Sequence, residues 1–95
     1  MISVTEKALS EVKHIIANKN VPQDFALRLL VEGGGGCGGA KFRLGFDRQK
    51  DGDDFVLLDG VKVVFEKRTL MFLLSVELDF EERESERGFV FKPKK

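Results

Sequence analysis

The segment FALRLLVEGGGGCGGAKFRLGF, residues 25–46, joins two β-type runs through a glycine stretch that surrounds the only cysteine of the chain, Cys37. The first run, Phe25–Glu32, is apolar enough to predict a largely buried strand. The second run, Lys41–Phe46, predicts a strand with one wet side because apolar residues alternate along it: Phe42, Leu44 and Phe46. Six of the ten glycines lie around the cysteine. Since ordered glycine costs more backbone entropy than any other residue, we infer that stability is not the purpose of this stretch.

An amphipathic helix is predicted before this segment, from Thr5 to Asn18, with Thr5 as its N-cap. Its apolar stripe follows the helical spacing and contains Ala8, Leu9, Val12, Ile15 and Ile16. The only histidine, His14, falls opposite the stripe, and we expect it to be a solvated surface residue rather than a ligand.

The rest of the chain alternates short β-type runs with turns. Residues 47–54 read as a solvated loop, and Asp59-Gly60 between FVLL and VKVVF predicts a β-hairpin. Residues 66–74 predict a short helix that presents Leu70, Phe72 or Leu73 to the core. A strand at VELDF, a charged edge or loop over Glu81–Arg87 and a closing strand at GFVFK complete a mostly β (α+β) fold with two helices. At 95 residues, we expect a single domain over 1–95.

Composition excludes several classes of partner. Sixteen Lys and Arg balance sixteen Asp and Glu, so no net field attracts nucleic acid or an anionic membrane. The apolar runs are too short to cross a bilayer, and the polar start lacks the apolar core of a secretory signal. One cysteine cannot form an intrachain disulfide, which favours a free thiol in a reducing compartment. We therefore expect a cytoplasmic protein.

Known glycine-rich and cysteine motifs do not fit the segment. A Rossmann turn needs a helix after the glycines, whereas a strand is predicted here, and the P-loop pattern fails at Lys41-Phe42. A cysteine hydrolase needs a nearby base, which His14 does not supply, and a redox pair or zinc ribbon needs more cysteines. No nucleophile, base and orienting group come together, so we expect no enzyme.

Two interpretations of Cys37 remain open from the residues alone. Bare glycine backbone lets a bulky group approach the sulfur, and a soft thiolate suits iron, zinc, copper and above all an iron-sulfur cluster. Alternatively, the cysteine is a small buried hydrophobe beside a glycine-rich hairpin loop.

The stretches LRLLVEGGGGCGGAKFRLGF, DGVKVVFEKRTLMFL, ELDF and GFVF, in this order, resemble the HesB-like, A-type iron-sulfur carrier family over nearly the whole chain. The resemblance implies two packed, mixed β layers with an N-terminal amphipathic helix and a second short helix. It also implies a homodimer or higher oligomer that receives iron or clusters and passes them between iron-sulfur scaffold and recipient apo-proteins.

Three features depart from the family pattern. The C-terminal C-x-C pair of typical members has no counterpart in these 95 residues, Phe42 stands where carriers commonly have tyrosine, and the glycine before L-D-F is replaced around Leu74 and Ser75. Of the family's ligands, the resemblance carries over Cys37 alone, as the residue that binds cofactor and metal.

Ligand counting then shapes the functional hypothesis. A [2Fe-2S] or [4Fe-4S] cluster takes four ligands, and one chain offers one thiolate. We expect iron or a labile cluster to be held by Cys37 across a dimer, with a small thiol such as glutathione, a partner or a carboxylate such as Glu32 completing the set. The alternative is a relative that no longer binds a cluster and serves as an interaction or regulatory module with a free or redox-sensitive thiol.

Overall fold

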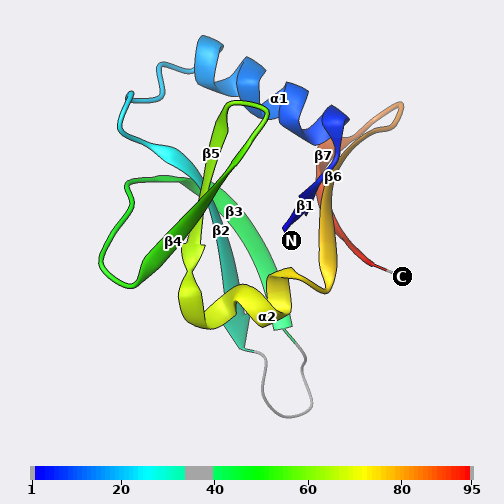
Figure 1. The fold of residues 1–95 in the computed structure, drawn as a ribbon. Coiled ribbons are helices and arrows are strands. Elements are labelled where there is room, and N and C mark those ends of the chain that lie inside the picture. Colours follow the sequence, from blue (N-terminus) through cyan, green and yellow to red (C-terminus); the bar gives the residue numbers. More distant parts are fainter. Residues whose placement is uncertain (1, 34–39, 95) are drawn as a thin grey trace.

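The computed structural model describes residues 2–33 and 40–94, which form two β-sheets with one helix at each end (Figure 1). The four-stranded sheet has the order β3-β2-β5-β4, and the three-stranded sheet has the order β1-β6-β7. The strands are β1 (Ser3–Val4), β2 (Ala26–Gly33), β3 (Ala40–Asp47), β4 (Asp53–Leu58), β5 (Val61–Glu66), β6 (Val76–Glu82) and β7 (Arg87–Pro93). The helices are α1 (Glu6–Asn18) and α2 (Leu70–Leu73), the latter preceded by a 3₁₀ turn, η2 (Lys67–Thr69). The predicted α+β fold with two packed β layers is confirmed.

Strand β2 lies inside the four-stranded sheet. It pairs antiparallel with β3 from Ala26–Asp47 to Gly33–Ala40, and parallel with β5 over Leu27–Leu29. Four consecutive residues near its start are buried, so both faces of the strand are covered there: Ala26, Leu27, Arg28 and Leu29. The predicted β2 and β3 runs are confirmed, with one residue of difference at each end.

The hairpin of β4 and β5 turns on two residues, as the sequence predicts. Leu58 pairs with Val61, and the intervening Asp59 and Gly60 have φ of 51° and 83°. Positive φ at both central positions is the geometry of the type I′ turn, which matches the right-handed twist of the flanking strands.

The three-stranded sheet contains one strand that the sequence analysis missed. Strands β6 and β7 pair antiparallel from Val76–Pro93 to Glu82–Arg87, and the two-residue β1 pairs parallel with β6. A two-residue strand is too short to show a period-2 pattern, so β1 cannot be predicted from local periodicity.

Helix α1 begins as predicted, because the Thr5 hydroxyl accepts a hydrogen bond from the Ala8 N–H at 3.1 Å. Ala8, Leu9 and Val12 are buried, and the helix packs on β6. The sequence predicts that Ile16 belongs to the packed apolar stripe, and this prediction is wrong. Ile16 is 38% exposed, because it lies in the last turn of the helix, which extends past the core. His14 is exposed, as expected, and lies within hydrogen-bond distance of the Asn18 amide.

Helix α2 presents one of the three predicted residues to the core. Leu73 is 1% exposed and enters the core, whereas Leu70 and Phe72 are both 37% exposed. A single turn of helix turns one narrow side toward the core, so neighbouring apolar residues point outward.

Two charged stretches contain strand residues, and in the first of them these residues replace part of the predicted loop. Asp53 and Asp54, predicted as part of a solvated loop, begin β4, and Asp53 is buried. In the charged stretch Glu81–Arg87, the first two residues continue β6 and Arg87 opens β7. Strand pairing overrides local polarity in both places.

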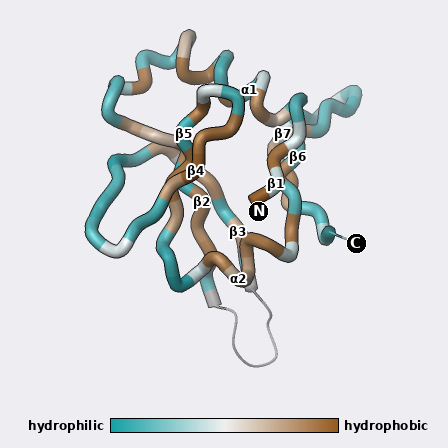
Figure 2. Tube along the Cα trace, in the orientation of Figure 1, coloured by the Kyte–Doolittle hydropathy of each residue, from teal (hydrophilic) through white to brown (hydrophobic). Residues whose placement is uncertain are grey.

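The core lies between the two sheets, under α1 and above α2, and Figure 2 shows the apolar segments converging there. Phe42 of β3 stacks on Phe91 of β7 with ring centroids 5.4 Å apart, which joins the two sheets directly. Among the described residues, the helices fall short of the length and apolarity that a membrane crossing requires.

Candidate functional site

The paired ends of β2 and β3 define the region of the predicted site. Antiparallel pairing continues to Gly33 and Ala40, and residues 34–39, five glycines and Cys37, join the two strands. Cys37, the predicted cofactor and metal ligand, lies outside the described residues. The strand ends that precede and follow it are adjacent, and they lie at the same end of the molecule as α2 (Figure 1).

The core side of this hairpin end is fixed by packing. Val31 and Phe42 are paired across β2 and β3, both are half-buried, and both pack against the hydrophobic core. Because the Phe42 ring also stacks on Phe91, Phe42 acts as a packing group between the two sheets. It contributes no oxygen ligand.

The outer side of the hairpin end is charged. Glu32 and Lys41 are cross-strand partners, and the Glu32 carboxylate lies 3.6 Å from the Arg43 guanidinium. The Glu32 side chain is 53% exposed, so the ion pair is solvated and weak. The carboxylate expected as the nearest additional ligand is therefore accessible from solvent at the end of β2.

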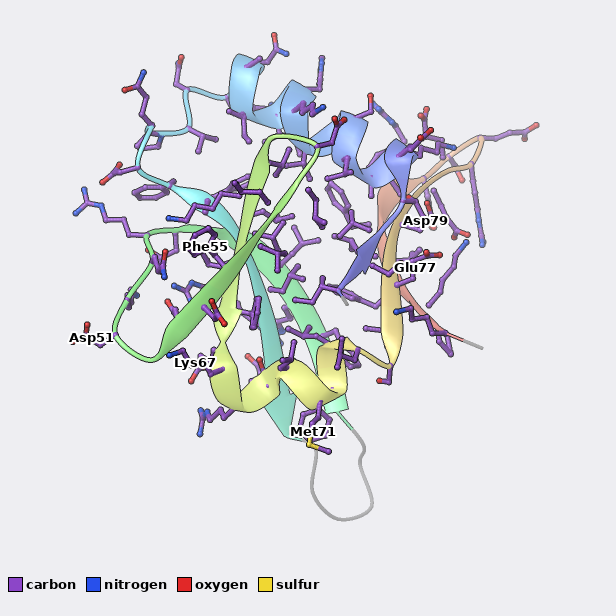
Figure 3. The ribbon with its side chains drawn as sticks, in the orientation of Figure 1. Asp51, Phe55, Lys67, Met71, Glu77 and Asp79 are labelled. Atoms are coloured by element: carbon purple, nitrogen blue, oxygen red, sulfur yellow. The ribbon has the colours of Figure 1, made fainter. Side chains whose placement is uncertain are left out.

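A groove runs beside this end of β2. Its volume is about 530 Å³, and its lining comes from β2, the end of β5, η2 and α2: Leu30, Val31, Glu32, Glu66, Arg68, Thr69 and Phe72. Next to it, α2 exposes Met71, 83% accessible, together with Leu70 and Leu74. Figure 3 shows the Met71 side chain pointing out from α2 at this end of the molecule. Of the exposed residues of α2, Leu70 and Phe72 are predicted from the sequence as alternatives for the core, and Met71 is given no role.

Other potential ligands are distant or dispersed. Helix α1, which carries His14, lies at the opposite end of the molecule from α2 (Figure 1). Within residues 2–33 and 40–94, no three or more His, Cys, Asp and Glu side chains gather in a group able to hold a metal ion.

A buried ion pair that sequence analysis missed lies in the four-stranded sheet. Arg28 and Asp53 are 7% and 8% exposed, and the Arg28 Nη2 and Asp53 Oδ2 atoms are 2.5 Å apart. The Asp53 carboxylate also accepts the Lys50 N–H, while Arg28 Nη2 donates to the Arg48 carbonyl. The hydrogen bonds from Arg28 hold the pKa of Asp53 below its usual value.

This ion pair has a structural explanation. It anchors the β3–β4 connection on β2, and the buried Arg28 Nε, which has no hydrogen-bond partner, lies 3.8 Å from the Asp47 carboxylate. Arg28 is the one charged residue in the apolar run of residues 25–31, which predicts a buried strand but does not identify a partner for the charge.

Comparison with known proteins gives consistent matches. The family model described as iron-sulphur cluster biosynthesis matches residues 1–94. The iron-sulfur cluster insertion protein ErpA of Xylella fastidiosa is 34% identical over 92 residues, which cover 96% of this chain and 70% of that protein.

Two solved structures share the fold. Escherichia coli SufA, involved in biosynthesis of iron-sulfur clusters, superposes with a TM-score of 0.77 at 23% identity, covering 96% of this chain and 78% of SufA. IscA with a [2Fe-2S] cluster superposes with a TM-score of 0.70 at 19% identity, covering 98% of this chain and 82% of IscA. With the family model spanning almost every residue, the chain belongs to the iron-sulphur cluster biosynthesis family, that of the HesB-like, A-type iron-sulfur carriers.

Proposed function

We propose that this protein carries iron or a labile iron-sulfur cluster as cargo, with Cys37 of two chains as ligands, and that it is not an enzyme. The observation that supports this most is the location of the cysteine in the glycine segment joining the paired ends of β2 and β3, in a chain matched by the family model over residues 1–94. A relative, IscA, has been solved with a [2Fe-2S] cluster.

The ligand count leads to the dimer. A cluster takes four ligands, usually thiolates, and each chain offers one cysteine. Two chains supply two thiolates, and the remaining positions fall to a small thiol, a donor or recipient protein, or an exposed carboxylate such as Glu32. Weak ligation of this kind suits a carrier, because its cargo has to leave as well as arrive.

The proposed partners follow from the same role. Iron-sulfur scaffolds deliver the cargo and recipient apo-proteins accept it, while neither nucleic acid nor a membrane takes part. We place this activity in the cytoplasm, where a reducing environment keeps a free thiol available.

Anaerobic reconstitution with iron and sulfide tests the proposal. We expect visible absorption, equal amounts of iron and sulfide at one [2Fe-2S] cluster for every two chains, and a solution mass that doubles on loading. Because the chain has no Trp and no Tyr, its own near-ultraviolet background is low. Cys37→Ser should remove the colour and the doubling together.

His14→Ala is the matched control, since it removes another potential metal ligand from the opposite end of the molecule. Its iron and sulfide contents should equal those of the wild type. Equal loading of Cys37→Ser and wild type would contradict the proposal.

The cysteine count also favours a second candidate function. With one thiol per chain, the protein could retain the family fold as an interaction or regulatory module with a redox-sensitive Cys37. The same reconstitution separates the two functions, because a wild type that stays colourless and unchanged in mass supports the module.

A further inference from the structure

Helix α2 presents an apolar surface that the core does not use. Leu70, Met71, Phe72 and Leu74 are all more than a third exposed, and Met71 reaches 83%. Single exposed apolar residues are common, but four within five positions form a local apolar patch, and exposure of this kind is typical of interaction sites. Methionine suits a surface that meets several partners, because its flexible thioether side chain adapts to different shapes.

An open strand edge lies beside this patch. Strand β5 pairs with β2 over Leu27–Leu29, and the chain then turns into η2 at Lys67. Beyond Leu29, no described strand pairs with β2 on this side, and the 530 Å³ groove lies along Leu30, Val31 and Glu32. An extended segment can add to such an edge through main-chain hydrogen bonds, with neighbouring pockets selecting its side chains.

The surrounding charges identify the kind of segment that fits. Glu32, Glu66 and Arg68 line the groove, and three further cations flank them on the paired strand or next to them in the sequence, which gives this region an excess of two positive charges: Lys41, Arg43 and Lys67. Each carboxylate faces an arginine, at 3.6 Å for Glu32–Arg43 and 3.0 Å for Glu66–Arg68. Within the described part of the chain, no ion pair joins Lys41 or Lys67 to a carboxylate.

The same charges argue against a second copy of this chain as the occupant of the groove itself, whereas the proposed dimer contact is made through Cys37. A two-fold contact places each patch against its own copy, so the excess positive charge of one meets that of the other. Complementarity instead requires a negatively charged partner with apolar side chains for Met71 and Phe72.

We propose that the groove between β2 and α2 is the docking site for an acidic, apolar-containing extended segment of a recipient protein, which adds as a strand to the open edge of β2. The inference rests on the proposed function, because it names the chemistry of the partner that takes the cargo. It places that partner at the end of the molecule where β2 and β3 meet the segment containing Cys37.

Amide chemical shifts of the isotope-labelled apo-protein test the docking without any cluster. The probe is the apo form of a [2Fe-2S] ferredoxin of strongly negative net charge. We expect shifts at residues 30–32 and 67–74, lost in Met71→Asp. Leu57→Asp is the matched control, because Leu57 is 64% exposed on β4, away from the groove, and its variant should keep the shifts.

Charge reversal tests the electrostatic part. Lys67→Glu should weaken binding of the apo-ferredoxin at least fivefold at low salt, whereas Lys7→Glu, the same change on α1 at the far end, should alter it less than twofold. Absence of shifts in the wild type, shifts centred on β4, or equal loss in the Leu57 and Met71 variants would each overturn the proposal.

Cluster transfer separates this inference from the proposed function. In reconstituted protein, Met71→Asp should load normally but deliver its cluster to the apo-ferredoxin at least tenfold more slowly than wild type and Leu57→Asp. Normal delivery by Met71→Asp would refute the docking site alone. A wild type that binds the ferredoxin but never loads would refute the carrier function and leave the docking site supported.

Discussion

Two hairpins of the same sheet perform the same topological task with very different connections. Strands β4 and β5 are joined by Asp59-Gly60, two residues whose positive φ values provide the turn. Strands β2 and β3 are joined by six residues between Gly33 and Ala40, five of them glycine and the sixth Cys37. Joining two antiparallel strands takes no more than two residues. Closing a hairpin therefore does not require the four additional residues, and we propose that they serve Cys37.

The two hairpins also differ in how they are attached. The β4 end of the short hairpin is fixed on β2 by the buried Arg28–Asp53 ion pair. The closing end of the long hairpin, by contrast, has a solvated Glu32–Arg43 pair and an open groove beside it. The sheet is therefore held firmly at the Arg28–Asp53 pair and is accessible at the β2–β3 hairpin end. This combination is expected of a scaffold that presents a binding site.

Breaking the attachment should have the largest effect on stability. Arg28→Ala leaves Asp53 buried without its cation, and loss of one member of a buried pair costs about 3–5 kcal/mol. Because a domain of this size has about 5–15 kcal/mol in total, urea unfolding should show a large drop in the free energy of unfolding. The double variant Arg28→Met with Asp53→Leu should recover part of it, since no unpaired charge remains. Equal stability of Arg28→Ala and wild type would show that the ion pair anchors nothing.

In the third hairpin, β6–β7, the carboxylate of Asp79 holds neighbouring elements together, and its protonation can be followed with pH. Asp79 accepts hydrogen bonds from the Lys92 ammonium, the Thr5 hydroxyl and the Phe80 N–H, and these lower its pKa to about 2. A folded-state pKa below the unfolded value of 3.8 stabilises the protein above about pH 4, and this stabilisation is lost as the pH falls toward 2. Since Lys92 is partly exposed, we expect the contribution to be about 1–2 kcal/mol.

Asp79→Asn tests this anchor because it removes the charge and keeps an oxygen acceptor. We expect a loss of about 1–2 kcal/mol at pH 7 and a flatter stability profile between pH 4 and pH 2, measured by urea unfolding across this range. Glu84→Gln, in the exposed connection of the same hairpin, should leave the profile unchanged. An acid limb that is identical in Asp79→Asn and wild type would contradict the assignment.

Changing the two-residue turn of the β4–β5 hairpin should reduce the stability of the protein by a smaller amount. Gly60 has a φ of 83°, so Gly60→Ala forces a side chain into the left-handed region at a cost of about 1–2 kcal/mol. Gly45→Ala in β3 is the matched control, because no atom lies within 4 Å of the added carbon and no positive φ is needed there. Thermal unfolding should show a lower Tm for Gly60→Ala and a nearly unchanged Tm for Gly45→Ala. If both variants had the Tm of the wild type, the positive φ of Gly60 would not contribute to stability, and the prediction would be wrong.

Much of the fold follows from local patterns, and the exceptions have physical causes. The Thr5 cap, the Asp59-Gly60 turn and the alternation in β3 act through neighbouring residues, so the sequence predicts them. The Arg28–Asp53 pair joins residues far apart in the chain, and its burial depends on the β2–β5 pairing that no local period shows.

The candidate site also contains one feature that the sequence predicts and one that it does not. Cys37 is evident from its glycine surroundings and from the family resemblance, whereas its role as a ligand stays a prediction. The exposed face of α2 was not predictable, because Leu70, Met71 and Phe72 have the composition of a core segment. Only the position of α2 at the edge of the core turns them outward.

Replacing residues 34–39 by Asn-Gly should have the smallest effect on stability and the clearest functional consequence. It makes the long hairpin resemble the short one. Shortening the connection from six to two residues reduces the loop-closure entropy, a gain of about 1 kcal/mol, and the Asn-Gly pair favours the type I′ turn. We therefore expect a small rise in Tm, unchanged β2–β3 pairing by amide hydrogen exchange, and complete loss of iron and sulfide binding.

The control for this replacement is Cys37→Ser, which keeps the six-residue connection and removes only the sulfur. If both variants fold like wild type and neither loads, the long connection exists for the thiol, and its glycines are the means by which bulky cargo reaches it. If the shortened protein unfolds or loses the β2–β3 register, the glycine segment is needed for the fold, and the difference between the two hairpins carries no functional meaning. The experiment thus decides whether the four additional residues belong to the structure or to the site.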